Sequence, residues 1–297
     1  MSVVGFIGLG NMGGPMAANL IKAGHKVQGF DIEQDRVRQF EKNGGDPVND
    51  IREISNNVDF VITMLPAGSH VRSVYLETCG VIASFNKNTL LIDCSTIDVA
   101  TAREVASEAE RAGLIMLDAP VSGGVMGAEA ASLTIMVGGN KRGFEQATSL
   151  LSLMGKNVIY TGSSGNGQVA KMCNNLMLGV SMIGVSEAFV LAEKLGLDHQ
   201  KLYDISSSSS GQCWSLTSYC PVPGPVPNSP ANRNYQAGFT VDMMLKDLQL
   251  SQESAKICGV ETPMGAKAAS LYDQFEGLGN GYLDFSGIIR LLRNGDS

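Results

Sequence analysis

The sequence has few of the residues from which metal centres and disulfide scaffolds are built. Its six cysteines show no C-x-x-C spacing, and its three histidines lie far apart in the chain. We therefore expect no metal site, and we predict buried free thiols in a reducing compartment. With a net charge of −7 and no long cluster of Lys or Arg, the chain also predicts no nucleic-acid partner, since phosphate contacts dominate that affinity.

Charged residues are also sparse, at 17% against 44% apolar residues, which is a globular and not a disordered composition. No charged-then-apolar leader precedes the first β-type run, so we expect no targeting peptide in this chain. The most apolar segment, 172–190, contains Asn, Ser and Glu, which argues against a membrane partner. Its 297 residues are enough for two domains.

The first half of the chain alternates short β-type runs with helical patterns. The predicted strands are 3–8, 26–31, 60–65, 89–95, 114–120, 133–139 and 157–162. A helical pattern such as 99–112 separates most of them, and this alternation is typical of a parallel, doubly wound sheet.

After residue 167 the pattern changes to long helical periods. We therefore predict a domain boundary after residue 163, with a doubly wound α/β domain over 1–163 and an all-helical domain over 164–297. Within the second domain, the serine run 206–211 and the proline-rich stretch 221–230 are irregular. On composition alone, a serine run of this kind is typical of a flexible linker.

A glycine motif of the form G-x-G-x-x-G joins the first strand to the first helical pattern. Its glycines permit a tight turn, close approach of the backbone to a pyrophosphate, and close packing of helix on strand. The alternative is a glycine turn with only a packing role. The predicted cofactor-binding residues of this motif are Gly8, Gly10, Asn11, Met12 and Gly13.

Asp31 ends the second predicted strand and strengthens the dinucleotide interpretation. A carboxylate there accepts hydrogen bonds from both ribose hydroxyls of NAD and repels a 2′-phosphate, so NAD is favoured over NADP. Arg36 and Arg38 leave a choice open: both are solvated helix residues, or one folds back onto a phosphate. FAD is disfavoured because the further motifs of flavoproteins are not found.

The carboxyl ends of two further strands carry residues that suit a ligand site. In open α/β sheets ligands lie outside these ends, so Leu65 and Pro66 are candidate walls of the cofactor site and Thr96 a candidate hydroxyl donor. An ordinary exit from strand to loop has the same residue types. Neither interpretation is favoured by position alone.

The stretch DAPVSGG, residues 118–124, offers the hydroxyl of Ser122 and the unhindered backbone N–H groups of Gly123 and Gly124. Such donors can converge on a carboxylate. The alternative is a plain β-turn.

Lys171 lies in an otherwise apolar helical run. By helical spacing it shares a face with Asn174, Asn175 and Leu178. Burial and the positive charge of an oxidised nicotinamide would both lower the pKa of this amine and make it a general base for a substrate hydroxyl. The alternative is a lysine at a helix start whose charged end reaches water.

Eight stretches together resemble the 3-hydroxyisobutyrate dehydrogenases of the β-hydroxyacid dehydrogenase family. In chain order they are GFIGLGNMG, MLP, DCSTID, DAPVSGG, GNGQVAKMCNN, SSGQCW, NYQAGF and MLKDLQL, and they span essentially the whole chain. The resemblance implies an α/β Rossmann N-terminal domain and an all-α C-terminal domain joined by a long interdomain helix. It implies that the first domain, 1–163, binds NAD and that the second, 164–297, serves substrate binding and dimerisation. It also turns the serine run into part of a substrate-side loop.

The same resemblance implies roles for individual residues. Lys171 is then catalytic, and Lys246 joins Leu65, Pro66 and Thr96 in binding the cofactor. The substrate-binding residues are Ser122, Gly123, Gly124, Asn175, Trp214, Phe239 and Asp247. The chain departs from the family pattern at Ala131, where a glycine is usual.

The activity implied is oxidation of a small 3-hydroxy acid, as in valine catabolism, by a homodimer or homotetramer in the bacterial cytoplasm or, after removal of a transit peptide, the mitochondrial matrix. Two different enzyme activities stay open: an L-serine or other β-hydroxyacid dehydrogenase, and an NADPH-dependent glyoxylate or succinic semialdehyde reductase. A possibility from another class is a catalytically silent dinucleotide-binding module.

Overall fold

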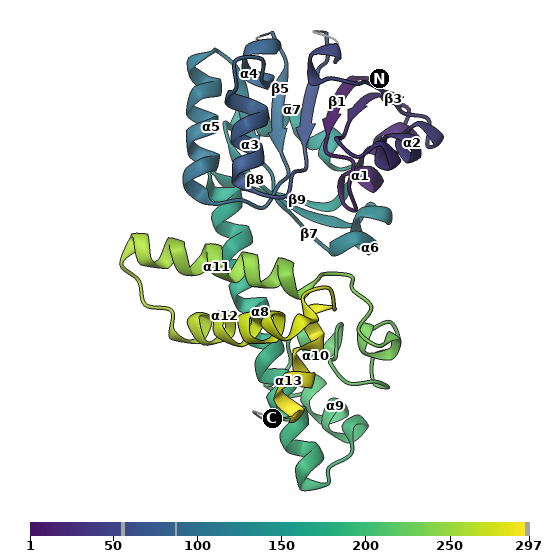
Figure 1. The fold of residues 1–297 in the computed structure, drawn as a ribbon, viewed down its shortest axis with the longest axis vertical. Helices are drawn as coiled ribbons and strands as arrows, with labels where there is room; N and C mark the ends of the chain where they lie inside the picture. Colours follow the sequence, from purple (N-terminus) through teal and green to yellow (C-terminus); the bar gives the residue numbers. More distant parts are fainter. Residues whose placement is uncertain (55–56, 87, 295–297) are drawn as a thin grey trace. The chain divides into compact units, whose positions relative to one another are not determined.

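The computed structural model describes residues 1–54, 57–86 and 88–294 (Figure 1). The chain divides into two compact units, Met1–Lys171 (unit 1) and Met172–Ser297 (unit 2). The predicted domain boundary after residue 163 stays a prediction, since the division by packing falls inside a helix.

Within the described residues, unit 1 is built on a nine-stranded sheet with the order β3-β2-β1-β4-β5-β6-β8-β7, and β9 pairs with β8. The strands are β1 (Val3–Ile7), β2 (Lys26–Phe30), β3 (Asp46–Pro47), β4 (Phe60–Thr63), β5 (Leu90–Asp93), β6 (Ile115–Asp118), β7 (Val121–Ser122), β8 (Leu133–Gly139) and β9 (Gly155–Gly162). Strands β1 to β6 pair in parallel, as predicted from the alternating pattern.

Two pairings differ from the expected parallel sheet: β8 runs antiparallel to β6 and to the short β7. A parallel return usually uses a helix that crosses back over the sheet. Between β6 and β8 the chain instead forms β7 and the six-residue helix α6, and then returns as β8 antiparallel to both strands.

Helices cover both faces of the sheet (Figure 1). They are α1 (Gly13–Lys22), α2 (Gln34–Lys42), η1 (Ile51–Glu53), α3 (Gly68–Leu76), α4 (Val81–Ser84), α5 (Val99–Arg111), α6 (Gly124–Glu129) and α7 (Lys141–Leu151). Successive residues of a strand pack into different hydrophobic clusters, one on each face of the sheet. Phe6 packs in the cluster that contains Met16 of α1, and Ile7 packs in the cluster that contains Val71 of α3. This two-residue alternation explains why the strands read as continuous apolar runs.

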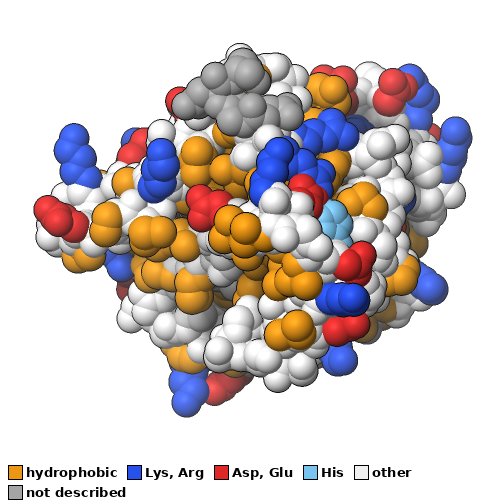
Figure 2. Space-filling view, turned by 90° about the horizontal axis from the view of Figure 1, so that it is seen from below, with side chains coloured by type: hydrophobic (Ala, Val, Ile, Leu, Met, Phe, Trp, Pro, Cys, Tyr) orange, Lys and Arg blue, Asp and Glu red, His pale blue; other side chains and the backbone are white. Residues whose placement is uncertain are grey.

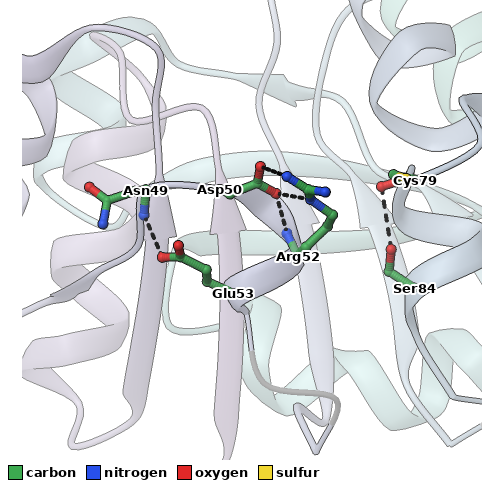
Figure 3. A network of polar contacts seen from close by, with 6 residues as sticks. All are labelled: Asn49, Asp50, Arg52, Glu53, Cys79 and Ser84. Carbon is green, nitrogen blue, oxygen red and sulfur yellow. Dashed lines mark hydrogen bonds and ion pairs between the residues drawn. The ribbon is translucent and has the colours of Figure 1, made fainter.

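A polar network surrounds η1 on the surface of unit 1 (Figure 3). Asp50 accepts hydrogen bonds from the backbone N–H and the guanidinium of Arg52, at 2.6–2.8 Å, and the pKa of Asp50 is lowered to about 2 as a result. Glu53 accepts from the backbone N–H of Asn49 at 2.9 Å. This network caps a single turn and involves none of the predicted site residues.

The regular elements in the described part of unit 2 are helices, apart from one isolated bridge between Thr240 and Asp284, and the chain is irregular between α10 and η2. Its elements are α8 (Asn166–Leu195, which starts in unit 1), α9 (His199–Ser207), α10 (Trp214–Thr217), η2 (Pro230–Arg233), α11 (Val241–Cys258), α12 (Pro263–Phe275), η3 (Glu276–Asn280), η4 (Phe285–Ile288) and α13 (Ile289–Asn294). The predicted fold class, with an all-α second part and a long helix, is confirmed.

Helix α8 is less buried than its nearly all-apolar sequence predicts. Met177 is 63% exposed, and Leu191 and Leu195 are exposed too. By length and composition alone α8 could cross a membrane, a criterion that core helices of soluble proteins also meet. Figure 2 shows further apolar side chains gathered on the face seen from below.

The six cysteines are free, but the predicted burial holds for only two of them. Cys94 and Cys220 are buried, whereas Cys79, Cys173 and Cys258 are exposed. The apolar neighbours of an exposed cysteine in sequence do not decide its burial, because on a helix they face other directions.

Candidate functional site

The glycine turn between β1 and α1 has the geometry that a dinucleotide fingerprint requires. Gly8 has φ of 94°, and a Cβ there would lie 2.3 Å from the carbonyl oxygen of Met64. A Cβ on Gly13 would lie 1.9 Å from the carbonyl oxygen of Gly8, whereas a Cβ on Gly10 would meet nothing within 4 Å. The turn is therefore closed where helix meets strand and open where a pyrophosphate would approach.

Asp31 is already bound to the turn. Its Oδ2 accepts a hydrogen bond from the backbone N–H of Leu9 at 2.6 Å, and its Oδ1 accepts from that of Glu33 at 2.8 Å. Each carboxylate oxygen retains a further lone pair for a ribose hydroxyl. These acceptor oxygens and the open side of Gly10 fit a dinucleotide whose ribose carries free hydroxyls.

Arg36, left undecided by the sequence, folds back onto the glycine turn. Its guanidinium donates to Oδ1 of Asn11 at 2.8 Å, while Arg38 pairs with Asp35 on the outside of α2. A cation thus lies beside the turn without touching Asp31 in any described contact. The helical position of Arg36 alone gave no signal for this contact.

Leu65, which follows β4, is hydrogen-bonded to Ser95, which follows β5. The backbone N–H of Leu65 donates to Oγ of Ser95 at 2.8 Å, and that hydroxyl in turn donates to Oδ1 of Asp93 at 2.6 Å. A Cβ on Gly8 would lie 3.2 Å from Cδ2 of Leu65, so Leu65 adjoins the glycine turn. Thr96 follows directly and is half-buried, whereas Pro66 is exposed.

Asp93, which the sequence prediction missed, lies at the centre of this connection. It is buried, and its Oδ1 also accepts from Oγ1 of Thr63 at 2.7 Å. Burial raises its pKa to about 6, and the charge of Asp118 on the next strand adds to that shift. Its place at a strand end, next to Cys94 and Ser95 in the DCST stretch, was the available signal.

The DAPVSGG stretch forms β7 and the turn into α6. Gly123 has φ of 137° and Gly124 φ of 62°, conformations that residues with a side chain rarely adopt. Ala131, at the end of the same segment, has φ of 52°, which explains why a glycine suits this position. The glycine-dependent turn exists; its carboxylate-binding role stays a prediction.

Asp118, the first residue of that stretch, caps the start of α8 across a long sequence separation. Its Oδ1 accepts from the backbone N–H of Gly165 at 2.7 Å and its Oδ2 from that of Gln168 at 3.0 Å. Burial raises the pKa of Asp118. A Cβ on Gly167 would lie 2.6 Å from the carbonyl oxygen of Asp118, so the first turn of α8 presses against the strand end.

Lys171 follows on this helix and is 6% exposed. A lysine whose charged end reaches water does not agree with that burial. It is the last residue of unit 1, and α8 carries the chain directly into unit 2 at Met172. An amine taken out of water favours its uncharged form, which is the form a general base needs.

In unit 2, the side chains of Asn175 and Asp247 lie together. Nδ2 of Asn175 donates to Oδ2 of Asp247 at 2.5 Å, and both side chains are buried. Nζ of Lys246 lies 3.7 Å from Oδ1 of Asp247. Asn174 supports the pair through a 3.0 Å hydrogen bond to Oδ1 of Asn175.

Trp214 and Phe239 belong to one aromatic cluster, although the sequence gave no direct link between them. Trp214 stacks on Tyr219 with ring centroids 4.8 Å apart, and Tyr219 stacks on Phe285 at 5.3 Å. Phe239 meets Phe285 edge-on at 5.7 Å. Asp284, also missed, fixes the cluster by accepting from the hydroxyl of Tyr219 and the backbone N–H of Phe239.

The structure thus gathers the predicted residues into two sets, one in each unit. Unit 1 holds the glycine turn with Asp31, the hydrogen-bonded carboxyl ends of β4 and β5, the turn at Ser122 and the buried Lys171. Unit 2 holds the Asn175–Asp247 pair with Lys246, and the aromatic cluster. The ligand role of each residue stays a prediction.

Two family models match the chain. Residues 3–162 match the NAD binding domain of 6-phosphogluconate dehydrogenase, and residues 165–292 match the NAD-binding domain of NADP-dependent 3-hydroxyisobutyrate dehydrogenase.

Known relatives match nearly the whole length. A probable mitochondrial 3-hydroxyisobutyrate dehydrogenase of Dictyostelium discoideum is 48% identical over 97% of this chain and 90% of that protein. An NAD-dependent L-serine dehydrogenase of Pseudomonas aeruginosa is 44% identical over 98% of this chain and 98% of that protein. The solved Mycobacterium tuberculosis 3-hydroxyisobutyrate dehydrogenase with L-serine is 46% identical, with a TM-score of 0.94 over 99% of both chains.

Proposed function

The chain belongs to the 3-hydroxyisobutyrate dehydrogenases of the β-hydroxyacid dehydrogenase family, and we propose that it oxidises 3-hydroxyisobutyrate to its semialdehyde with Lys171 as general base. Membership makes it an oxidoreductase that acts on a CH–OH group with NAD. The observation that carries the finer proposal is the burial of a single lysine one helical turn before Asn175.

The glycine turn and Asp31 hold the cofactor. The open side of Gly10 admits the pyrophosphate, the N-terminus of α1 faces it without an acidic residue in its first turn, and Asp31 accepts the ribose hydroxyls. Leu65, Pro66, Thr96 and Lys246 complete the contacts. When bound, NAD supplies the acceptor for the hydride that leaves the carbinol carbon.

The substrate carboxylate is held by the hydroxyl of Ser122 and the N–H groups of Gly123 and Gly124. Positive φ angles at both glycines turn the backbone into a conformation that can present adjacent N–H groups to one anion. The chain's part in the reaction is then to orient the hydroxyl-bearing carbon and to exclude water.

Lys171 takes the proton of the substrate hydroxyl. The O–H bond breaks, its proton moves to the uncharged amine at Nζ, and its electrons form the carbonyl as hydride leaves the carbon. Two electrons and one proton leave with the hydride, and one proton stays on Lys171. Asn175, Trp214, Phe239 and Asp247 are the residues proposed to bind the rest of the substrate.

L-serine is a second candidate substrate, and two findings favour it. One relative is named an NAD-dependent L-serine dehydrogenase, and one structural relative is titled with L-serine. Serine shares the hydroxyl at the β-carbon and differs at the α-carbon, where an amino group replaces a methyl group.

An NADPH-dependent reductase and a silent binding module are both less well supported. Asp31 disfavours the reductase, although one matching model describes an NADP-dependent enzyme. A silent binding module does not explain why a lysine is buried. The homodimer or homotetramer, and the location in cytoplasm or mitochondrial matrix, stay predictions.

Replacing Lys171 by methionine tests the base assignment, because methionine keeps the apolar length and removes the amine. We expect kcat to fall by roughly 10²–10⁴-fold. The Kd of NAD, measured by calorimetry, should stay within about threefold, since the amine is not needed for the glycine turn to bind it. Turnover is followed as NADH absorbance with 3-hydroxyisobutyrate and with L-serine.

The matched control is Lys194→Met on the exposed last turn of the same helix. It should leave both kcat and the Kd of NAD unchanged. Near-normal turnover in Lys171→Met would refute the base. A higher kcat/KM for L-serine than for 3-hydroxyisobutyrate would refute the substrate assignment and leave the base assignment standing.

A further inference from the structure

We propose that Gln168 is a positioning residue, whose buried side-chain amide ties the first turn of α8 to the exit of β5 and thereby sets the place of Lys171. The inference rests on the proposed function of Lys171. It assigns to Gln168 a contribution to turnover that is separate from contact with substrate.

The side chain of Gln168 binds the backbone on both sides of Thr96. Its Nε2 donates to the carbonyl oxygen of Ser95 at 2.7 Å, and its Oε1 accepts from the backbone N–H of Ile97 at 3.1 Å. The residue is 1% exposed, so both bonds form away from water. The planar amide thus matches one donor and one acceptor of a strand exit that carries a predicted cofactor residue.

From Ser95 the connection continues to a second strand exit. The hydroxyl of Ser95 accepts from the backbone N–H of Leu65, which adjoins the glycine turn. The side chain of Gln168 is therefore bound to the segment that organises the exits of both β4 and β5. A shift of Gln168 would move this segment relative to the helix.

On the helix side, the connection to Lys171 is short and stiff. Lys171 is three residues further on, which places it on the neighbouring turn of the same face. The backbone N–H of Gln168 is bound to Asp118, and the absence of a side chain at Gly167 lets this turn lie against β6. Asp118 accepts from the backbone N–H groups of Gly165 and Gln168 at the start of the helix, so the side-chain amide of Gln168 is not needed to start it.

Two kinds of role predict different results. If Gln168 only stabilised the fold, its loss would lower the unfolding midpoint and leave kcat of the folded protein unchanged. If it positions Lys171, its loss lowers kcat while NAD still binds. Misplacement of a reacting group by about 1 Å can cost roughly 10²-fold in rate.

The substitution Gln168→Glu separates these roles within one variant. A protonated glutamic acid keeps both bonds, since its O–H donates to Ser95 and its C=O accepts from Ile97. An ionised glutamate loses the donor and brings its charge against the carbonyl oxygen of Ser95. The other carboxyl groups near this segment, Asp93 and Asp118, are the same in variant and wild type, as is Lys171.

The experiment compares kcat of Gln168→Glu with that of wild type at each pH from about 5.5 to about 8.5, together with the Kd of NAD. We expect the ratio of variant to wild type to fall at least tenfold across this range, with the Kd of NAD within about threefold. The matched control is Gln252→Glu, a half-buried glutamine whose Nε2 donates to Ser251 and whose Oε1 accepts from Thr262. Its ratio should stay constant.

A kcat of Gln168→Glu within twofold of wild type at every pH, in protein that urea unfolding shows to be folded, would overturn the positioning role. A kcat at least tenfold lower at every pH supports it, since the glutamate is then ionised across the whole range. If the variant unfolds at neutral pH, Gln168→Asn is measured instead, since its shorter side chain cannot reach both partners. A kcat at least tenfold lower supports the inference, and an unchanged kcat overturns it. Loss of activity in Lys171→Met alongside a wild-type-like Gln168→Glu refutes this inference alone.

Discussion

Two buried aspartates, one in each unit, organise their surroundings in different ways. Asp93 in unit 1 receives all its hydrogen bonds on Oδ1, and its Oδ2 has no hydrogen-bond partner among the described residues. Asp284 in unit 2 is bonded on both oxygens, and its donors are the hydroxyl groups of Tyr219 and Ser286 and the backbone N–H groups of Gly238, Phe239 and Ser286. Both carboxyl groups are almost wholly buried.

Burial alone does not define what a carboxyl group does. A buried carboxyl group needs hydrogen-bond partners for both of its oxygens, and Asp284 has them. Asp93 has donors on one side only, so burial raises its pKa to about 6. Asp284 therefore acts as a structural anchor, whereas Asp93 is poised to change charge near neutral pH.

The largest expected effect comes from Asp284→Ala. The change leaves five donors without their acceptor, two of them buried and three partly buried, and should lower the free energy of unfolding by roughly 3–5 kcal/mol. Urea unfolding followed by near-ultraviolet circular dichroism measures it, since the aromatic cluster reports through Trp214. The exposed Asp273→Ala on α12 is the control and should change stability by less than about 0.5 kcal/mol. Equal effects in both variants would contradict the anchoring role.

A smaller, pH-dependent effect is expected for Asp93→Asn. The folded-state pKa of Asp93, about 6, lies above its ordinary value of 3.8, so the native state binds more protons between these values. Wild-type stability therefore falls, by about 3 kcal/mol from this group, as pH rises from about 4 to about 7.

The Asp93→Asn variant lacks this fall, so its stability relative to wild type should rise over the same interval. Unfolding free energies measured at several pH values between about 4 and about 8 give the difference. A difference that is constant with pH would show that Asp93 titrates alike in the folded and unfolded chain.

The smallest effect extends the comparison to the backbone. Tyr235 in unit 2 adopts φ of 59°. The cost of this backbone conformation is offset by a hydrogen bond from its hydroxyl to the carbonyl oxygen of Pro221 and by the guanidinium of Arg290 over its ring. Ala131 in unit 1 adopts φ of 52° with only a methyl group. Ala131→Gly should therefore stabilise the protein by about 0.5–1 kcal/mol. In the control Ala130→Gly, where φ is −82°, a loss of about 0.5–1 kcal/mol is expected. A loss in both variants, measured as thermal midpoints, would contradict the strain at Ala131.

Most of the fold was predictable because its signals are local. Apolar runs and glycine turns gave the main strands, and long helical periods gave the second unit. The antiparallel return of β8 was not predicted, since it depends on what fits between β6 and β8 and not on the residues of β8. The exposure of Met177 on α8 likewise depends on which elements pack beside it.

Candidate site residues could be named where a residue type is itself the signal, as at Gly8, Asp31 and Lys171, whose ligand roles stay predictions. Asp93, Gln168 and Asp284 were missed because their importance lies in long-range hydrogen bonds. Gln168, for example, bonds to a residue 73 positions away. No local pattern distinguishes such a glutamine from a solvated one.

The way α8 begins has a consequence for exchanging parts between related chains. Its opening N–H groups are satisfied by Asp118, some 50 residues earlier, and not by a neighbouring side chain. A chimaera joined just after residue 163 would therefore pair one parent's helix start with the other parent's strand end. Joining the parents after Lys171 keeps donor and acceptor from a single ancestor, so that crossover point should give the more active hybrids.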